Sequence, residues 1–284
     1  MLFYLTFIPK QQTPQLILGG TREGNKMSDD YHWFQVKMLE KTGIDLTLYK
    51  EEQMKRRLTS LKTKHQAASF QEYYRLISDS KDLFNECLDK ITINVTEFFR
   101  NKQRWDILEH QIMPELLENN QGRLKVWSSA CSTGEEPYSL SIMMSKYLRP
   151  EHYQILATDI DEKVLGVAAQ GKFPERALKE VSVGERDNYF TECEGTWEIK
   201  PIIKKPVQFK KLNLLSDAYD QGFDLILCRN VVIYFTDEAK KLLYKKLANA
   251  LKSGGVLFVG STEQIFNPSV YGLEPIETFF YKKV

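Results

Sequence analysis

The sequence has little of the chemistry that marks several protein classes. It has four cysteines, in neither a CxxC pair nor a Cys/His spacing, so we expect free thiols in a reducing compartment and no metal site. Its 39 basic residues barely exceed its 38 acidic ones, which argues against a nucleic-acid binder. It has no apolar run of about 18 residues, so no direct membrane insertion is expected.

The first 26 residues look foreign to the rest of the chain. The apolar start Met1–Ile8 has no basic region before it and no cleavage site after it, so it is a poor signal peptide. Arg22–Gly24 can be encoded by a purine-rich ribosome-binding sequence a few codons before Met27. We therefore expect translation to start at Met27, and residues 1–26 to be a non-native or disordered extension.

Residues 27–104 have the periodicity of helices. Apolar side chains recur at three- and four-residue spacing in Tyr31–Met38, Met54–Leu61 and Leu83–Ile91, which predicts a small all-α domain. A linker helix is expected over residues 105–123. One predicted helix is strongly basic, with Lys50, Lys55, Arg56, Arg57, Lys62 and Lys64. That helix has either a solvated polar face or a docking surface for an acidic partner.

Residues 124–284 alternate between apolar strands and helices, which is typical of a parallel α/β sheet. The expected strands include Leu124–Ser128, Tyr153–Ala157 and Phe223–Cys228. Between about residues 172 and 211 this order breaks. Trp197–Lys200 and Val207–Lys210 alternate with a period of two, so we expect a small antiparallel β-subdomain insert there.

The loop Ser128–Gly134 joins the first of these strands to a helix. Its small residues would let a ligand approach the backbone. It has one glycine instead of the G-x-G-x-x-G of dinucleotide sites, and Glu135 and Glu136 stand where a pyrophosphate would bind. A cationic ligand without phosphate, such as S-adenosylmethionine, fits better. An ordinary strand–helix turn is the alternative.

Further polar residues lie at the ends of predicted strands. Asp159 ends the second strand, where a carboxylate can bind ribose hydroxyls or cap the next helix. Arg229 and Asn230 follow the central strand and would be unusual core residues, which favours a ligand role. The segment Asn94–Arg100 should cross this edge of the sheet, as part of the site or as a linker with an aromatic plug.

Several motifs occur in one order: Asn94–Arg100, Ala130–Ser139, Ala157–Asp161, Asn213–Leu215, Cys228–Phe235 and Gly260–Glu263. Together, over about Met27 to Lys282, they closely resemble the chemotaxis receptor methyltransferases of bacteria, the CheR family. The resemblance implies an all-α N-terminal domain and a Rossmann-like α/β methyltransferase sheet with a β-subdomain insert. It also implies S-adenosylmethionine as cofactor, S-adenosylhomocysteine as product, and cytoplasmic methylation of glutamates on the cytoplasmic helices of chemoreceptors.

The same resemblance implies roles for individual residues. Arg100 and Tyr234 would be catalytic, with Tyr234 near the acceptor carboxylate. The cofactor-binding set would be Asn94, Thr96, Arg100, Glu135, Asp159, Asn213, Leu214, Arg229 and Asn230. Within this set Glu135 would hold the methionine end, Asp159 the ribose, and Asn213 with Leu214 the adenine.

Receptor docking is the expected role of the basic helix, through Lys55, Arg56, Arg57 and Lys62, because methylated receptor helices present glutamates. Some family members also tether to a receptor tail through the insert. The segment between Phe190 and Val207 is short and has only Gly195, which puts tail tethering in doubt here.

Three alternatives are weaker. A methyltransferase acting on RNA or nitrogen would want a basic surplus and a D/N-P-P-Y turn, where this chain has Arg229-Asn230-Val231. A non-catalytic sensor would bind the cofactor and receptor complexes without transferring a methyl group. A nicotinamide dehydrogenase would need the missing glycine loop.

Overall fold

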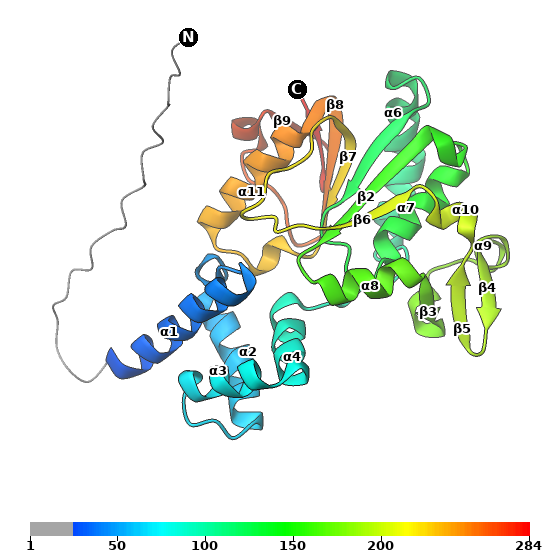
Figure 1. The fold of residues 1–284 in the computed structure, drawn as a ribbon. Helices are drawn as coiled ribbons and strands as arrows, with labels where there is room; N and C mark the ends of the chain where they lie inside the picture. The colour runs from blue at the N-terminus through cyan, green and yellow to red at the C-terminus, as the bar shows by residue number, and fades with distance from the viewer. Residues whose placement is uncertain (1–24) are drawn as a thin grey trace, which may run out of the picture.

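A computed structural model describes residues 25–284 of the chain (Figure 1). The expectation for residues 1–26 thus lies outside the described residues, except at Asn25 and Lys26. The described chain forms a helical domain, a seven-stranded sheet and a three-stranded sheet. This confirms the predicted fold class, an all-α domain before a mostly parallel α/β sheet with a small antiparallel insert.

The helical domain packs its apolar stripes around one core that includes Phe34, Leu58 and Tyr73. Its helix α1 ends before Gly43, whose positive φ of 73° suits a glycine. The elements are α1 (Asn25–Thr42), η1 (Leu46–Leu48), α2 (Glu51–Lys64), α3 (Phe70–Asp79) and α4 (Lys81–Thr92). None of the helices in the described part of the chain is both long and apolar enough to cross a membrane.

A continuous helical run links this domain to the main sheet. It comprises α5 (Lys102–Ile107), the π-helical turn η2 (Leu108–Ile112) and α6 (Met113–Asn119). The main sheet has the strand order β6-β2-β1-β7-β8-β10-β9, in which β10 pairs antiparallel with both of its neighbours, β8 and β9. Its strands are β1 (Leu124–Ser128), β2 (Tyr153–Asp159), β6 (Val207–Lys211), β7 (Phe223–Cys228), β8 (Leu251–Val259), β9 (Leu273–Glu277) and β10 (Phe280–Lys283).

Helices cover both faces of the sheet, so the central strand β7 is buried at every residue. Successive side chains of a strand point to opposite faces. Leu225 and Leu227 therefore pack with α7 (Glu135–Ser145), whereas Ile226 packs with α11 (Asp237–Ala250). A shorter helix, α8 (Glu162–Gln170), follows β2. Short 3-10 turns complete the domain: η3 (Pro150–His152), η5 (Val232–Tyr234) and η6 (Pro268–Tyr271).

The insert is smaller than predicted. Its sheet has the order β3-β5-β4, and its elements are β3 (Lys172–Pro174), η4 (Glu175–Leu178), α9 (Val183–Tyr189), β4 (Phe190–Cys193), β5 (Thr196–Ile199) and α10 (Pro201–Lys204). The prediction that Val207–Lys210 is an antiparallel strand of the insert was wrong. It is β6, which pairs parallel with β2 at the edge of the main sheet. Alternation of apolar and polar residues with a period of two indicates a strand with one exposed face. An edge strand can have this pattern whether it pairs parallel or antiparallel with its neighbour.

Candidate active site

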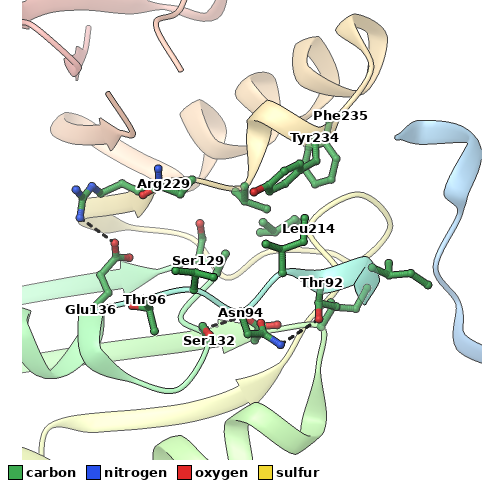
Figure 2. Close-up of a pocket in the computed structure, with 18 of the residues that line it drawn as sticks. Thr92, Asn94, Thr96, Ser129, Ser132, Glu136, Leu214, Arg229, Tyr234 and Phe235 are labelled. Carbon is green, nitrogen blue, oxygen red and sulfur yellow. Dashed lines mark hydrogen bonds and ion pairs between the residues drawn. The ribbon is translucent and has the colours of Figure 1, made fainter. Parts of the chain in front are cut away.

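A cavity lies where β2, β1 and β7 end side by side, at Asp159, Ser128 and Cys228 (Figure 2). It spans about 950 Å³ including its open side. The chain leaves β1 for β2 on one side and later enters β7 on the other, so the cavity occupies the switch point of the sheet. Residues 91–97 and Tyr49 of the helical domain also line it.

The loop after β1 is shaped by the backbone of β2. Asp159 is buried, and its two carboxylate oxygens accept the Ser132 and Asp161 N–H groups at 2.9 and 3.0 Å. Burial nevertheless raises the pKa of Asp159. Gly134 has a φ of 101°, and a Cβ there would lie 2.9 Å from the Ala168 Cβ. Only glycine permits this close turn, which opens α7.

Of the two acids that begin α7, Glu136 lines the cavity. Its carboxylate accepts the Ser128 hydroxyl at 2.8 Å and pairs with Arg229 at 3.2 Å (Figure 2). Burial raises its pKa even so. Glu135 is buried but is not among the residues that line the cavity, and it accepts the Thr133 hydroxyl at 2.7 Å. The cofactor role assigned to Glu135 stays a prediction that its position does not support.

The segment from residue 94 to residue 100 combines both roles considered for it. Phe98 packs edge-on against Phe173 of the insert, at 4.8 Å between ring centroids, so the aromatic pair anchors the segment. Asn94, Thr96 and Arg100 line the cavity. The Asn94 amide also donates to the Asp161 carboxylate at 3.2 Å, which ties the segment to the start of α8.

Arg229 is a buried residue whose contacts stabilise the site. Its guanidinium donates to the Arg100 carbonyl at 2.7 Å and lies 4.6 Å from the ring centroid of Phe258. The Trp105 indole donates to the same carbonyl at 3.1 Å. Burial lowers the pKa of Arg229, and the nearby Glu136 carboxylate partly offsets that decrease. The backbone of Arg100 is therefore fixed while its side chain faces the cavity.

Glu263 fixes the opposite wall. Its buried carboxylate accepts four backbone N–H groups, from Gly260, Asn230, Val232 and Ile233, at 2.9, 2.6, 2.7 and 3.3 Å. Burial raises its pKa, and these bonds oppose the rise. They hold Asn230, which has a φ of 61°, at the cavity wall.

At the far end the cavity meets the helical domain. Asn213 and Leu214 line it there, as do Tyr49 and Phe235, whose rings meet edge-on at 5.1 Å. The Asn213 amide donates to the Gly43 carbonyl at 3.0 Å. Asn213 therefore joins the two domains, and Tyr49 adds an aromatic wall that the sequence did not indicate.

Tyr234 lies across the cavity from Thr96 (Figure 2). Its carbonyl accepts the Lys50 N–H at 2.9 Å. The Arg57 guanidinium of α2 lies 4.7 Å from the centre of its ring. The basic helix and the catalytic candidate thus meet at one edge of the cavity.

Every predicted site residue except Glu135 lines this cavity. Sequence reasoning missed Tyr49, Ser132, Glu136 and Glu263. The sequence does mark two of these residues, since Glu136 is an acid at the start of a helix and Glu263 ends the Gly260–Glu263 motif.

The sequence matches two family descriptions. Residues 29–92 match "CheR methyltransferase, all-alpha domain", and residues 94–280 match "CheR methyltransferase, SAM binding domain". The chain belongs to the CheR methyltransferase family.

Curated relatives extend the family match. A "Chemotaxis protein methyltransferase" of Listeria innocua is 47% identical over 257 residues, covering 90% of this chain and 98% of the relative. "Chemotaxis protein methyltransferase 1" of Pseudomonas aeruginosa is 36% identical over 250 residues, covering 84% and 91%. A TehB-like methyltransferase structure from Corynebacterium glutamicum is 16% identical, covers 65% and 97%, and has a TM-score of 0.37, too low to support an argument.

CheR proteins have an S-adenosylmethionine-binding domain, so this chain is a methyltransferase that uses that cofactor. The cavity fits it. Asp159 and Glu136 are carboxylates whose charged forms burial disfavours, and a cationic ligand would relieve that cost. The buried Ser132 hydroxyl has no hydrogen-bond partner among the described residues, which leaves it for a ligand.

Proposed function

We propose that this CheR protein methylates glutamate side chains on the cytoplasmic helices of chemoreceptors, forming methyl esters in the cytoplasm. The observation that carries the proposal is the contact of Arg57 with the ring of Tyr234 at the cavity edge. An acidic helix lying along α2 would bring its carboxylates to this edge. The printed names of the relatives, chemotaxis protein methyltransferases, support it.

Methyl transfer to a glutamate carboxylate depends more on alignment of the two reactants than on a general base. A glutamate side chain is already anionic at neutral pH. When bound, S-adenosylmethionine supplies a methyl group on a positively charged sulfonium. Transfer neutralises opposite charges, so a cavity that excludes water favours it. Phe98 and Phe99, both buried, exclude water on the side of residues 94–100.

Arg100 and Tyr234 are the residues proposed to orient the acceptor. One guanidinium nitrogen of Arg100 donates to the Val95 carbonyl at 2.8 Å, which sets the direction of the side chain. Its other N–H groups are then available for a charge-assisted bond to the acceptor carboxylate. The Tyr234 hydroxyl would donate a second bond from the facing wall.

The basic helix α2 is the proposed docking surface. Lys55, Arg57 and Lys62 each lie over an aromatic ring, between 4.7 and 5.4 Å from its centroid. Their charged groups are thus held against the surface by cation–π contacts, and each side chain is only partly covered. Arg56 is exposed and has no ion-pair partner among the described residues. We do not assign a receptor-tail contact to the insert, because its strands β4 and β5 are joined only by a short turn at Glu194 and Gly195.

Transfer of labelled methyl from S-adenosylmethionine to membranes that contain chemoreceptors would test the proposal. The label should be released as methanol in alkali, because an ester hydrolyses there. Membranes whose receptor has glutamine at the methylated glutamates are the control and should take up none. Alkali-stable label would place the methyl group on another atom and refute glutamate esterification.

A further inference from the structure

A second basic surface lies beside the turn that carries Tyr234. It consists of two adjoining hollows between α11 and residues 262–271, which share Lys241, Phe266 and Tyr271. The two hollows span about 930 and 910 Å³ including their open sides. We call the pair the α11 groove.

The groove exposes large apolar side chains. Phe266 is 83% exposed and Val270 72% exposed, and Leu242 of α11 lies with them. The backbone beneath them is held in place, because the Ile265 N–H donates to the Tyr281 hydroxyl at 2.9 Å. An apolar patch on such an ordered support is typical of an interaction site.

The charges of the groove are mainly positive. Lys241 and Lys245 have no ion-pair partner among the described residues, and Lys240 pairs with Asp237 at 2.8 Å. Lys240 holds the pKa of Asp237 below its usual value, with help from Lys50 and Lys241. The carboxylate of Glu263 is turned to backbone N–H groups. An occupant must therefore combine acidic and apolar side chains.

The groove borders a turn that the catalytic cavity also touches, and it reaches the residue that precedes α2. Val232 and Ile233 line the groove and belong to η5, the turn that also carries Tyr234. Lys50 also lines the groove; it precedes α2 and donates its N–H to the Tyr234 carbonyl. The two basic surfaces thus both border the turn at the cavity edge. A helical bundle presents neighbouring helices to such adjoining surfaces.

We infer that the α11 groove docks an acidic amphipathic helix of the same receptor bundle, next to the helix that is methylated. This inference rests on the proposed function. Phe266 and Val270 contact the apolar stripe of that helix, and the lysines meet its carboxylates. The groove therefore contributes to receptor affinity and has no part in methyl transfer itself.

The double variant Lys241→Glu, Phe266→Ala tests this, with Ile202→Ala, Lys205→Glu, on α10 and at its C-terminal end, as the matched control. The control also changes one exposed apolar residue and one exposed lysine, and α10 lies across the molecule from α11 (Figure 1). Co-sedimentation with membranes carrying a methyl-accepting chemoreceptor gives the Kd, and initial rates give KM and kcat. We expect Kd and KM to rise about tenfold in the groove variant alone. Its kcat and its calorimetric affinity for S-adenosylhomocysteine should stay at the wild-type value.

Four outcomes decide the question. A Kd of the groove variant equal to that of the control would refute receptor docking in the α11 groove. A weakened Kd in a protein whose wild type transfers no methyl group would support the groove and refute the proposed chemistry. Failure of the wild type to bind the membranes would overturn both. A wild-type dimer that the groove variant converts to a monomer in sedimentation equilibrium would assign the groove to a contact between copies.

Discussion

The cofactor cavity and the two basic surfaces around it are built in opposite ways. In the cavity and behind its wall, acidic side chains are fixed by the backbone: Asp159 accepts two N–H groups, and Glu263, which supports the Asn230 wall, accepts four. On α2 and along α11, long basic side chains extend from exposed helices and use few direct partners, as Arg56 and Lys241 do. The cavity is preorganised, and the surfaces are adaptable.

This difference sets what a mutation costs. Removing a fixed, buried group leaves its partners unsatisfied in a low dielectric, where an unpaired polar group is expensive. Removing an exposed charge costs little because water and salt already screen it. We therefore expect large, salt-insensitive effects inside the cavity and small, salt-sensitive effects outside it.

The largest effect should come from Arg100→Ala. It removes the proposed acceptor-orienting group but leaves intact the Arg100 carbonyl that Arg229 and Trp105 contact. Turnover on receptor membranes should fall about a hundredfold with little change in melting temperature. Arg104→Ala removes a nearby arginine that stacks on Phe279 outside the cavity, and it should keep most of the activity. A near-wild-type kcat for Arg100→Ala would refute the assignment.

Glu263→Gln should have the next largest effect. An amide has one acceptor oxygen, so its NH₂ group would face backbone N–H groups that now donate to a carboxylate. The Asn230–Tyr234 turn should loosen, lowering kcat about tenfold with a loss of about 2 kcal/mol of unfolding free energy. Glu274→Gln, at an exposed site on β9, should change neither quantity. If kcat in Glu263→Gln stays unchanged while stability falls, Glu263 does not position this wall.

Acidification should weaken cofactor binding several-fold. Asp159 and Glu136 favour a cationic ligand only when charged, and burial raises both pKa values, so they take up protons at a higher pH than exposed acids. Affinity should fall as the pH drops through those raised values. The contribution of these two groups to the stability of the free protein has the opposite sign, because groups with raised pKa stabilise the fold at low pH and lose that contribution as pH rises. Calorimetry between pH 7.5 and 4.5 measures the affinity, and a constant Kd would contradict this reading.

The smallest effect should come from Arg56→Glu on α2. KM for receptor membranes should rise about threefold at low salt, and the difference should disappear as added salt screens the charge. Arg75→Glu on α3 reverses an exposed arginine outside α2 and should leave KM unchanged. A KM difference that persisted at high salt would mean that Arg56 acts through packing. Salt sensitivity would then no longer distinguish the surface from the cavity.

Much of the cavity lining was predictable from the sequence, because residues at the switch point lie at the ends of strands or directly after them. Asp159, Arg229 and Asn230 are examples. Glu135 and Glu136 show the limit. Successive helix residues point about 100° apart, so one of two adjacent acids faces the cavity, and the sequence does not say which. Tyr49 was missed because it lies far along the chain from the loops that it faces.

The sequence by itself determined the family, the cofactor, the all-α domain before a parallel sheet, and the basic character of α2. These follow from local periodicity, from residue types at strand ends, and from motifs in a fixed order. Only the tertiary structure decided that β6 joins the main sheet, that Glu136 faces the cavity, that Glu263 holds the Asn230 wall, and that α2 and the α11 groove both border the turn that carries Tyr234. Each of those joins residues distant in the chain, and packing selects such pairs from many that local patterns allow.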